Sequence, residues 1–117
     1  MRSNIYTTRA VLDEAQHKLD ILETEDDLLE SYGITEADVE AIRQSLSRKG
    51  AAPIIFQFML TSKQREALAG ELGNSADIQD SNIGHIRRSG GDKKEASTLA
   101  RFACDLRRAI KQLESEK

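Results

Sequence analysis

The first half of the chain shows the apolar periodicity of amphipathic helices. One stripe at helical spacing predicts a helix over residues 8–22, which Thr7 or Thr8 can cap at its start. The stripe consists of Val11, Leu12, Ala15, Leu19 and Leu22. A short second helix is expected to start with Thr24 as its cap and to end at Gly33, because glycine readily takes the left-handed conformation that closes many helices.

The strongest local signal for a helix start lies at Thr35. Thr35 and Asp38 have the spacing of a capping box, while Ile34 and Val39 occupy the two positions of a hydrophobic staple. The helix predicted from this signal carries an apolar stripe and ends at Gly50. The stripe consists of Val39, Ile42 and Leu46.

After the single proline the apolar pattern changes to a period of two. Six of the seven residues 54–60 are strongly apolar, and most are β-branched or aromatic, which predicts a strand covered on both faces. A strand cannot stand alone, so its partner has to come from residues 4–7 or 83–86, or from a second copy across a twofold axis. Pairing across a dimer places the oligomer interface at Ile55, Phe58 and Met59.

The second half holds two further helix signals. Thr61 and Gln64 form another capping-box pattern, and the helix that follows is expected to end at Gly73. Glycine, serine, asparagine and aspartate then crowd residues 74–92, which predicts a flexible basic loop. The last helix is expected over residues 93–115, where neither proline nor glycine occurs. Its apolar stripe consists of Leu99, Phe102, Ala103, Leu106, Ile110 and Leu113.

Together these patterns predict a mainly α fold with a minor β element, in a single domain over residues 1–117. We expect four to five helices and one strong strand at about 54–60, paired in a small sheet or across a dimer. The acidic helical half covers residues 1–50, and a strand–helix unit follows at 53–72. The basic loop covers residues 74–92, and the last helix covers 93–115. The expected core consists of Leu12, Leu19, Leu22, Val39, Ile42, Leu46, Phe56, Phe58, Leu99, Phe102, Leu106 and Ile110.

Charge is unevenly distributed along the chain, whose net charge is −3. Residues 1–50 hold six basic and eleven acidic residues, whereas residues 85–111 hold eight basic and three acidic ones. A basic loop beside a basic helical face can grip phosphates, and the competing interpretation is an ordinary solvated polar face. The candidate contacts for an anion or a nucleic acid are Arg87, Arg88, Lys93, Lys94, Arg101, Arg108 and Lys111.

The sequence holds no nucleophile elbow, no phosphate-binding glycine loop and no zinc-hydrolase helix motif. Cys104 is the only cysteine, which excludes an intramolecular disulfide and a zinc site built from two cysteine pairs. The acidic run at residues 23–30 lacks the glycine turn and alternating oxygen ligands of a calcium loop. We therefore expect no catalytic residue, no metal and no cofactor. An enzyme would have to rely on His85 or Cys104.

These observations lead to two functional hypotheses. Abundant amphipathic helix, an unpaired strand and the lack of a catalytic pattern favour a non-catalytic protein–protein interaction module. Such a module would act as a small regulator, adaptor or inhibitor, and as a homo-oligomer, in the first place a dimer. The alternative is a nucleic-acid-binding regulator that uses the basic loop 85–94 and the basic face of the last helix. No apolar run approaches the roughly 18 residues of a membrane span, so a cytoplasmic location is expected.

Overall fold

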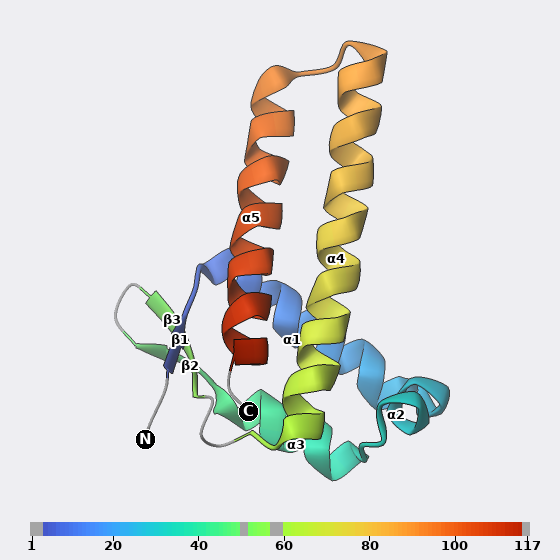
Figure 1. Ribbon diagram of the computed structural model, residues 1–117, viewed down its shortest axis with the longest axis vertical. Helices are drawn as coiled ribbons and strands as arrows, with labels where there is room; N and C mark the ends of the chain where they lie inside the picture. The colour runs from blue at the N-terminus through green and yellow to red at the C-terminus, as the bar shows by residue number, and fades with distance from the viewer. Residues whose placement is uncertain (1–3, 50–51, 57–59, 116–117) are drawn as a thin grey trace.

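The computed structural model describes residues 4–49, 52–56 and 60–115. In these residues the chain is mainly α with a minor β element, as the sequence predicts. The helices are α1 (Arg9–Thr24), α2 (Asp26–Tyr32), α3 (Glu36–Ser45), α4 (Ser62–Ser89) and α5 (Lys93–Ser115), and the strands are β1 (Asn4–Tyr6), β2 (Leu46–Lys49) and β3 (Ala52–Phe56). The helices α4 and α5 stand side by side as a long antiparallel hairpin, and the other elements gather around its lower half (Figure 1).

The strand β3 is the centre of a small antiparallel sheet with the order β1–β3–β2. Ile55 lies opposite Ile5 on one side and opposite Leu46 on the other. Of the three partners that the sequence left open, the structure shows the strand at residues 4–6, whereas residues 83–86 are helical. Both hydrogen-bonding edges of β3 are occupied within the chain, so this strand needs no second copy to satisfy its backbone.

The helix predicted to end at Gly50 stops earlier. The helix α3 ends at Ser45, whose hydroxyl donates a 2.6 Å hydrogen bond to the carbonyl of Ile42, and the chain continues directly as β2. Local signals favoured more helix, but β2 pairs with the second edge of β3, and Leu46 stays buried in the core. This long-range pairing outweighs local helix propensity. Gly50 lies outside the described residues.

The flexible loop predicted at residues 74–92 is wrong. The helix α4 runs through Gly73 and Gly84 to Ser89, and only the turn 90–92 separates it from α5. The helix persists because its apolar residues pack along α5. Ala76 and Ile83 are buried in that contact, while most of the polar side chains that suggested a loop face away from it.

Most of the predicted helix ends are confirmed. Thr8, Thr35 and Thr61 are the N-caps of α1, α3 and α4, and the last two form complete capping boxes. Gly33 closes α2 with a left-handed φ of 70°. Among the predicted N-caps Thr24 is wrong, because its hydroxyl donates to a carbonyl within α1 and α2 begins without a side-chain cap.

The two capping boxes are joined to each other. The Asp38 carboxylate accepts the backbone N–H of Thr35 and the side-chain amide of Gln64, each at 2.8 Å. Gln64 in turn accepts the backbone N–H of Thr61 at 3.0 Å. The first turns of α3 and α4 are thereby fastened together. The hydrogen bonds that Asp38 accepts lower its pKa, and the bond from Gln64 has the largest effect.

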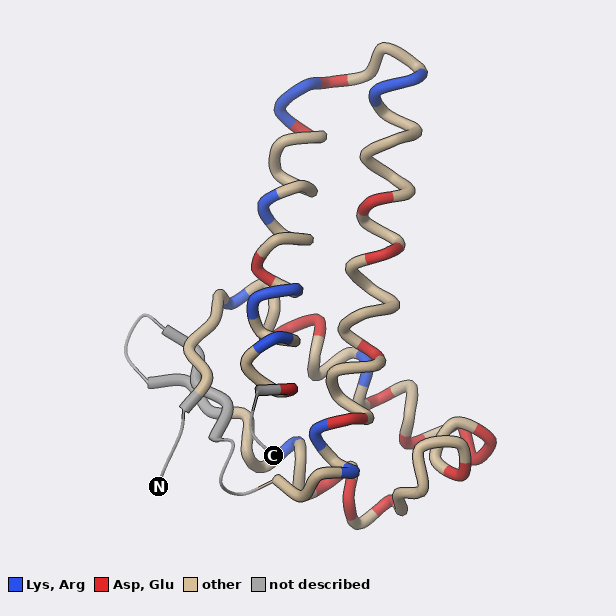
Figure 2. The backbone as a smooth tube through the Cα atoms, viewed as in Figure 1, with Lys and Arg blue, Asp and Glu red and all other residues tan. Residues whose placement is uncertain are grey.

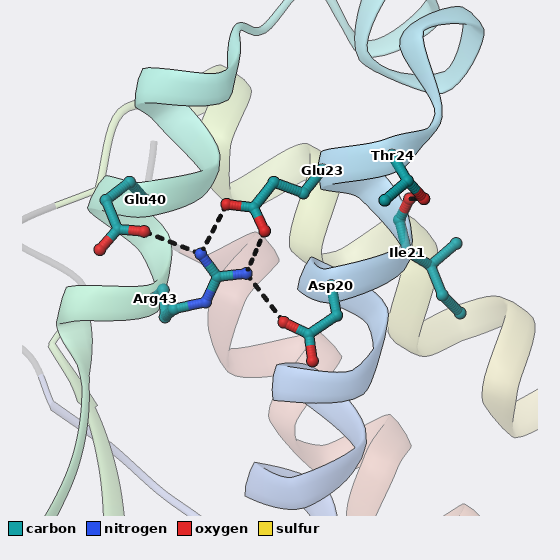
Figure 3. A network of polar contacts seen from close by, with 6 residues as sticks. All are labelled: Asp20, Ile21, Glu23, Thr24, Glu40 and Arg43. Atoms are coloured by element: carbon teal, nitrogen blue, oxygen red, sulfur yellow. Dashed lines mark hydrogen bonds and ion pairs between the residues drawn. The ribbon is translucent and has the colours of Figure 1, made fainter.

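Arg43 fastens α3 to α1 (Figure 3). Its guanidinium donates to Asp20 at 2.9 Å, to both oxygens of Glu23 at 3.0 and 3.1 Å, and to Glu40 at 2.8 Å. The bond to Glu23 contributes most to raising the pKa of Arg43, which stays charged. One cation thus serves three carboxylates, and the surface of α1 and α3 remains acidic around it.

The core lies where the lower half of the hairpin meets α1, α3 and the sheet. Its largest fully buried side chains are Ile5, Val11, Leu19, Leu22, Val39, Ile42, Leu68, Leu72, Leu106 and Leu113. Phe102 and Ile110, which the sequence placed in the core, pack against it half-buried. Leu99 is also half-buried, and the side chains of Phe56 and Phe58 lie outside the described part. Among the described helices, none is both long and apolar enough for a membrane crossing.

Candidate functional site

The upper half of the hairpin projects beyond the helices and the sheet that cover its lower half (Figure 1). Its turn is built around glycines. Gly90 has a left-handed φ of 72°, and the N–H of Gly91 donates to the carbonyl of Ile86 at 2.8 Å. A Cβ on Gly91 would lie only 3.0 Å from the Ile86 side chain. Asp92 then accepts the backbone N–H of Lys94 at 2.9 Å at the start of α5.

Four of the predicted anion contacts flank this turn in the sequence. Arg87 and Arg88 lie in the last turn of α4, Lys93 and Lys94 begin α5, and all four are exposed. Arg87 and Lys93 line the same hollow of about 410 Å³ beside the turn. A tight helical turn, rather than the predicted loop, therefore brings these cations together.

The remaining predicted cations continue down the outer side of α5. Lys94, Arg101 and Arg108 recur every seven residues, which is two helical turns or about 10.5 Å. All three are exposed, and Lys111 follows on the next turn. A shallow hollow of about 430 Å³ is lined by Lys93, Lys94, Ser97, Thr98 and Arg101.

Arg107 is neutralised, and the cations of the predicted set are not. Arg107 reaches across the hairpin to Asp80, with Asp77 at 3.8 Å, and the bond to Asp80 raises its pKa. Within the described residues, no carboxylate forms an ion pair with any of the seven cations that the sequence singled out. Their charge is left to the solvent or to a partner.

The other end of the molecule has the opposite charge. Residues 9–45, which form α1, α2 and α3, hold three basic and eleven acidic residues. Figure 2 shows these acidic positions around the base of the hairpin and the basic positions at its tip and along α5. The tip lies at the far end of the hairpin from α1, α2 and α3, whereas the lower end of α5 lies beside α1.

The face of the hairpin away from α1 is open and grooved. A lower groove of about 660 Å³ is floored by Ala69, Gly73 and Ile110, with Glu66, Glu114 and Arg65 at its sides. An upper groove of about 510 Å³ is lined by Asp80, Ile83, Gly84, Arg87, Ala100, Ala103, Cys104 and Arg107. Both grooves are lined by α4 and α5 alone. The small residues that shape them were in the sequence, but they form a stripe only once α4 is known to be continuous.

The predicted oligomer interface at the strand stays a prediction. Ile55 is in β3, whose two edges are paired within the chain, and its side chain is not among those described. Phe58 and Met59 lie outside the described residues. The structural motive for a dimer through this strand, an edge without a partner, is removed.

The residues of the catalytic alternative are not brought together by a hydrogen bond. His85 is exposed on α4, and Cys104 is exposed on α5, where it lines the upper groove. In the part of the chain that the structure describes, no three His, Cys, Asp or Glu side chains are grouped to hold a metal ion.

No protein-family model matches this chain, and neither a curated protein nor a solved structure does so. The geometry of the hairpin is therefore the basis for the functional proposals that follow.

Proposed function

We propose that this protein is a non-catalytic interaction module whose α4/α5 hairpin associates with a second copy of the chain. The observation that carries the proposal is the open hairpin face, whose two grooves are lined by no residue of α1, α2, α3 or the sheet. A groove between two helices, floored by small and apolar side chains, is the kind of surface that a helix of a partner fills. In this arrangement the two hairpins form a four-helix contact.

Charge selects the orientation of the two copies. The sides of the lower groove carry two carboxylates and one guanidinium, whereas the upper groove carries Arg87, Arg107 and Asp80. An antiparallel pair places the upper groove of each copy over the lower groove of the other, so that opposite net charges face each other. A parallel pair would bring the two cationic tips together. A single twofold axis closes either arrangement, so charge decides between them.

Such a module acts by holding partners in place rather than by chemistry. This role fits a small regulator, adaptor or inhibitor. The dimer presents the acidic helices α1 to α3 of both copies, and both basic hairpin tips, to further partners. The catalytic alternative would need a nucleophile and a base within hydrogen-bond reach, which His85 and Cys104 do not provide in the described part.

The test is analytical ultracentrifugation over a hundredfold dilution, with Gly73→Gln as the probe. Nothing lies within 4 Å of a Cβ at Gly73, so the side chain fits the single chain while it obstructs the lower groove. We expect a dimer for the wild type and a folded monomer for Gly73→Gln. The control Ser81→Gln changes an exposed position of the same helix outside both grooves and should stay dimeric.

Met59→Lys separates this interface from the strand interface expected from the sequence. If Met59→Lys dissociates the dimer and Gly73→Gln does not, the contact lies at residues 54–60. A wild-type monomer at every concentration would refute self-association through either surface.

A further inference from the structure

The cationic side of α5 and the hairpin tip form a surface separate from the open face. We propose that this surface binds the phosphate backbone of a nucleic-acid duplex without reading its sequence. Its members are Arg87, Arg88, Lys93, Lys94, Arg101, Arg108 and Lys111. Only Arg87 also lines the upper groove, so a duplex and a second copy of the chain can be held at the same time.

The spacing of the cations suits a linear polyanion. Lys94, Arg101 and Arg108 lie along one rigid helix, about 10.5 Å apart and about 21 Å from first to last. A duplex presents phosphates at regular intervals along its axis, and each cation that neutralises one releases condensed counterions. Because the charges project from a helix that is already formed, binding requires no folding of their backbone.

Hydroxyl groups stand beside the cations. Ser97 and Thr98 line the same hollow as Lys93, Lys94 and Arg101. The Thr98 hydroxyl donates to the Lys94 carbonyl at 2.9 Å, and the Ser97 hydroxyl is exposed. The Thr98 proton is thus already used, and Ser97 is the hydroxyl that can donate to a phosphate oxygen beside the Lys and Arg side chains, a combination common in protein–DNA backbone contacts.

Three acidic residues, Asp92, Glu95 and Asp105, lie among the cations of this surface, but none forms an ion pair with them in the described structure. Asp105 lies four residues after Arg101 and three before Arg108, yet it forms an ion pair with neither in the described structure. The acidic helices α1 to α3 lie at the base of the hairpin, where α1 contacts the lower end of α5, so their charge favours a duplex bound towards the tip (Figure 2).

Two other anionic partners fit less well. A membrane surface is bound by helices that also expose large apolar side chains, and the large hydrophobic residues exposed among the described residues are Tyr6 and Ile78, neither on α5. Single strands are bound by stacking on aromatic side chains, and Phe102, the aromatic residue among these cations in the sequence, packs against the core instead. A duplex requires neither feature.

The test is fluorescence anisotropy of a labelled duplex of mixed sequence, titrated with the full chain at several salt concentrations. Binding should weaken between about 50 and 200 mM salt, with log K falling by about 0.9 per phosphate neutralised for each unit of log salt. Lys93→Gln/Lys94→Gln should lower the affinity roughly tenfold to hundredfold at about 0.1 M salt and reduce the salt slope by about two. Arg101→Gln/Arg108→Gln should do the same if α5 is the contact.

The matched control is Lys18→Gln/Lys63→Gln, which removes two lysines from α1 and from the start of α4. It should keep the affinity and the slope, and circular dichroism should show all three double variants folded. Equal loss in the control, no binding at low salt, or equal binding of polyglutamate would each overturn the proposal. So would binding of phosphatidylserine vesicles without binding of the duplex. Gly73→Gln should retain duplex binding, which separates this proposal from dimer formation.

Discussion

The most deeply buried carboxyl group in the described structure belongs to Glu71, which is only 4 % exposed. It accepts a 2.5 Å hydrogen bond from the hydroxyl of Tyr32 and a longer one from Asn74 at 3.5 Å. Burial, and then the bond to Glu71, raise the pKa of Tyr32, so the phenol remains the donor. The bond joins α2 to α4 and keeps the buried acid satisfied.

Tyr32→Phe should therefore lower the free energy of unfolding, although it removes a single oxygen atom. It leaves a buried carboxyl without its main donor, and an expected loss of about 1–3 kcal/mol in the free energy of unfolding follows. Urea denaturation measures it. Glu71→Gln keeps an acceptor opposite Tyr32 and should lose less. If Tyr32→Phe were as stable as the wild type, the bond would contribute nothing to the fold.

Gly70 and Gly73 provide a matched pair on one helix. An alanine in a helix interior is usually about 0.5–1 kcal/mol more stable than glycine. Nothing lies within 4 Å of a Cβ at Gly73, so Gly73→Ala should raise the Tm. A Cβ at Gly70 would lie 2.9 Å from the Tyr32 hydroxyl and push it off Glu71, so Gly70→Ala should lower the Tm. In dilute protein the Tm values of the two variants should thus shift in opposite directions. A Tm for Gly70→Ala at or above that of Gly73→Ala would show that the contact with Tyr32 does not destabilise the variant.

At the scale of elements, the helix starts could be predicted from the sequence because a cap is a local device. Thr8, Thr35 and Thr61 each bond within three residues of themselves, and Gly33 needs only its own conformation. The joining of two capping boxes through Asp38 and Gln64 could not be predicted, since the two residues lie 26 positions apart.

The failures at the element scale share one physical cause. The strand β2 and the upper half of α4 are fixed by partners distant in sequence, β3 and α5, which outweigh the local composition. The sequence identified the cations of the candidate site and the direction in which those on the last helix point. It could not place Arg87 and Arg88 beside Lys93 and Lys94, because that needs a continuous α4 and a three-residue turn.

The joint between α3 and α4, the hydrogen bond between Asp38 and Gln64, should stabilise the fold in a pH-dependent way. The pKa of Asp38 is lowered in the folded chain, chiefly by the hydrogen bond from Gln64. A carboxyl of this kind stabilises the fold above its unfolded pKa of 3.8, and the contribution disappears as the pH falls through the lower, folded value. Asp38→Asn should therefore be less stable than the wild type at neutral pH.

That difference in stability should shrink once the pH is below 3.8. Urea denaturation of both proteins across this range measures it. Glu36→Gln removes an acidic residue from the same helical turn and takes no part in the joint, so its difference from the wild type is the control. A gap between wild type and Asp38→Asn that stays constant with pH would show that the ionised carboxylate is not what the joint uses.

At the scale of the whole molecule, the chain measures 45 × 34 × 23 Å. It consists of the acidic helices α1 to α3 and of the α4/α5 hairpin, whose tip and α5 are basic. The lower half of the hairpin packs against α1 to α3, whereas in the upper half α4 and α5 pack only against each other. Ile78 is 51 % exposed there, and the Arg107–Asp80 pair is exposed as well. Surface ion pairs stabilise little, so the upper half is the part of the fold held least firmly.

Amide hydrogen exchange should reveal this gradient along α4. Amides around Leu68 and Leu72, which are fully buried, should exchange only on global unfolding, while those beyond Asp77 should exchange through local opening at lower free energy. An antiparallel dimer would cover the upper half with the lower groove of the second copy. Protection beyond Asp77 should then rise with protein concentration in the wild type and stay constant in Gly73→Gln. Uniform protection along α4 would contradict the gradient. Upper-half exchange independent of concentration would contradict the dimer, because the proposed association covers that surface in each copy.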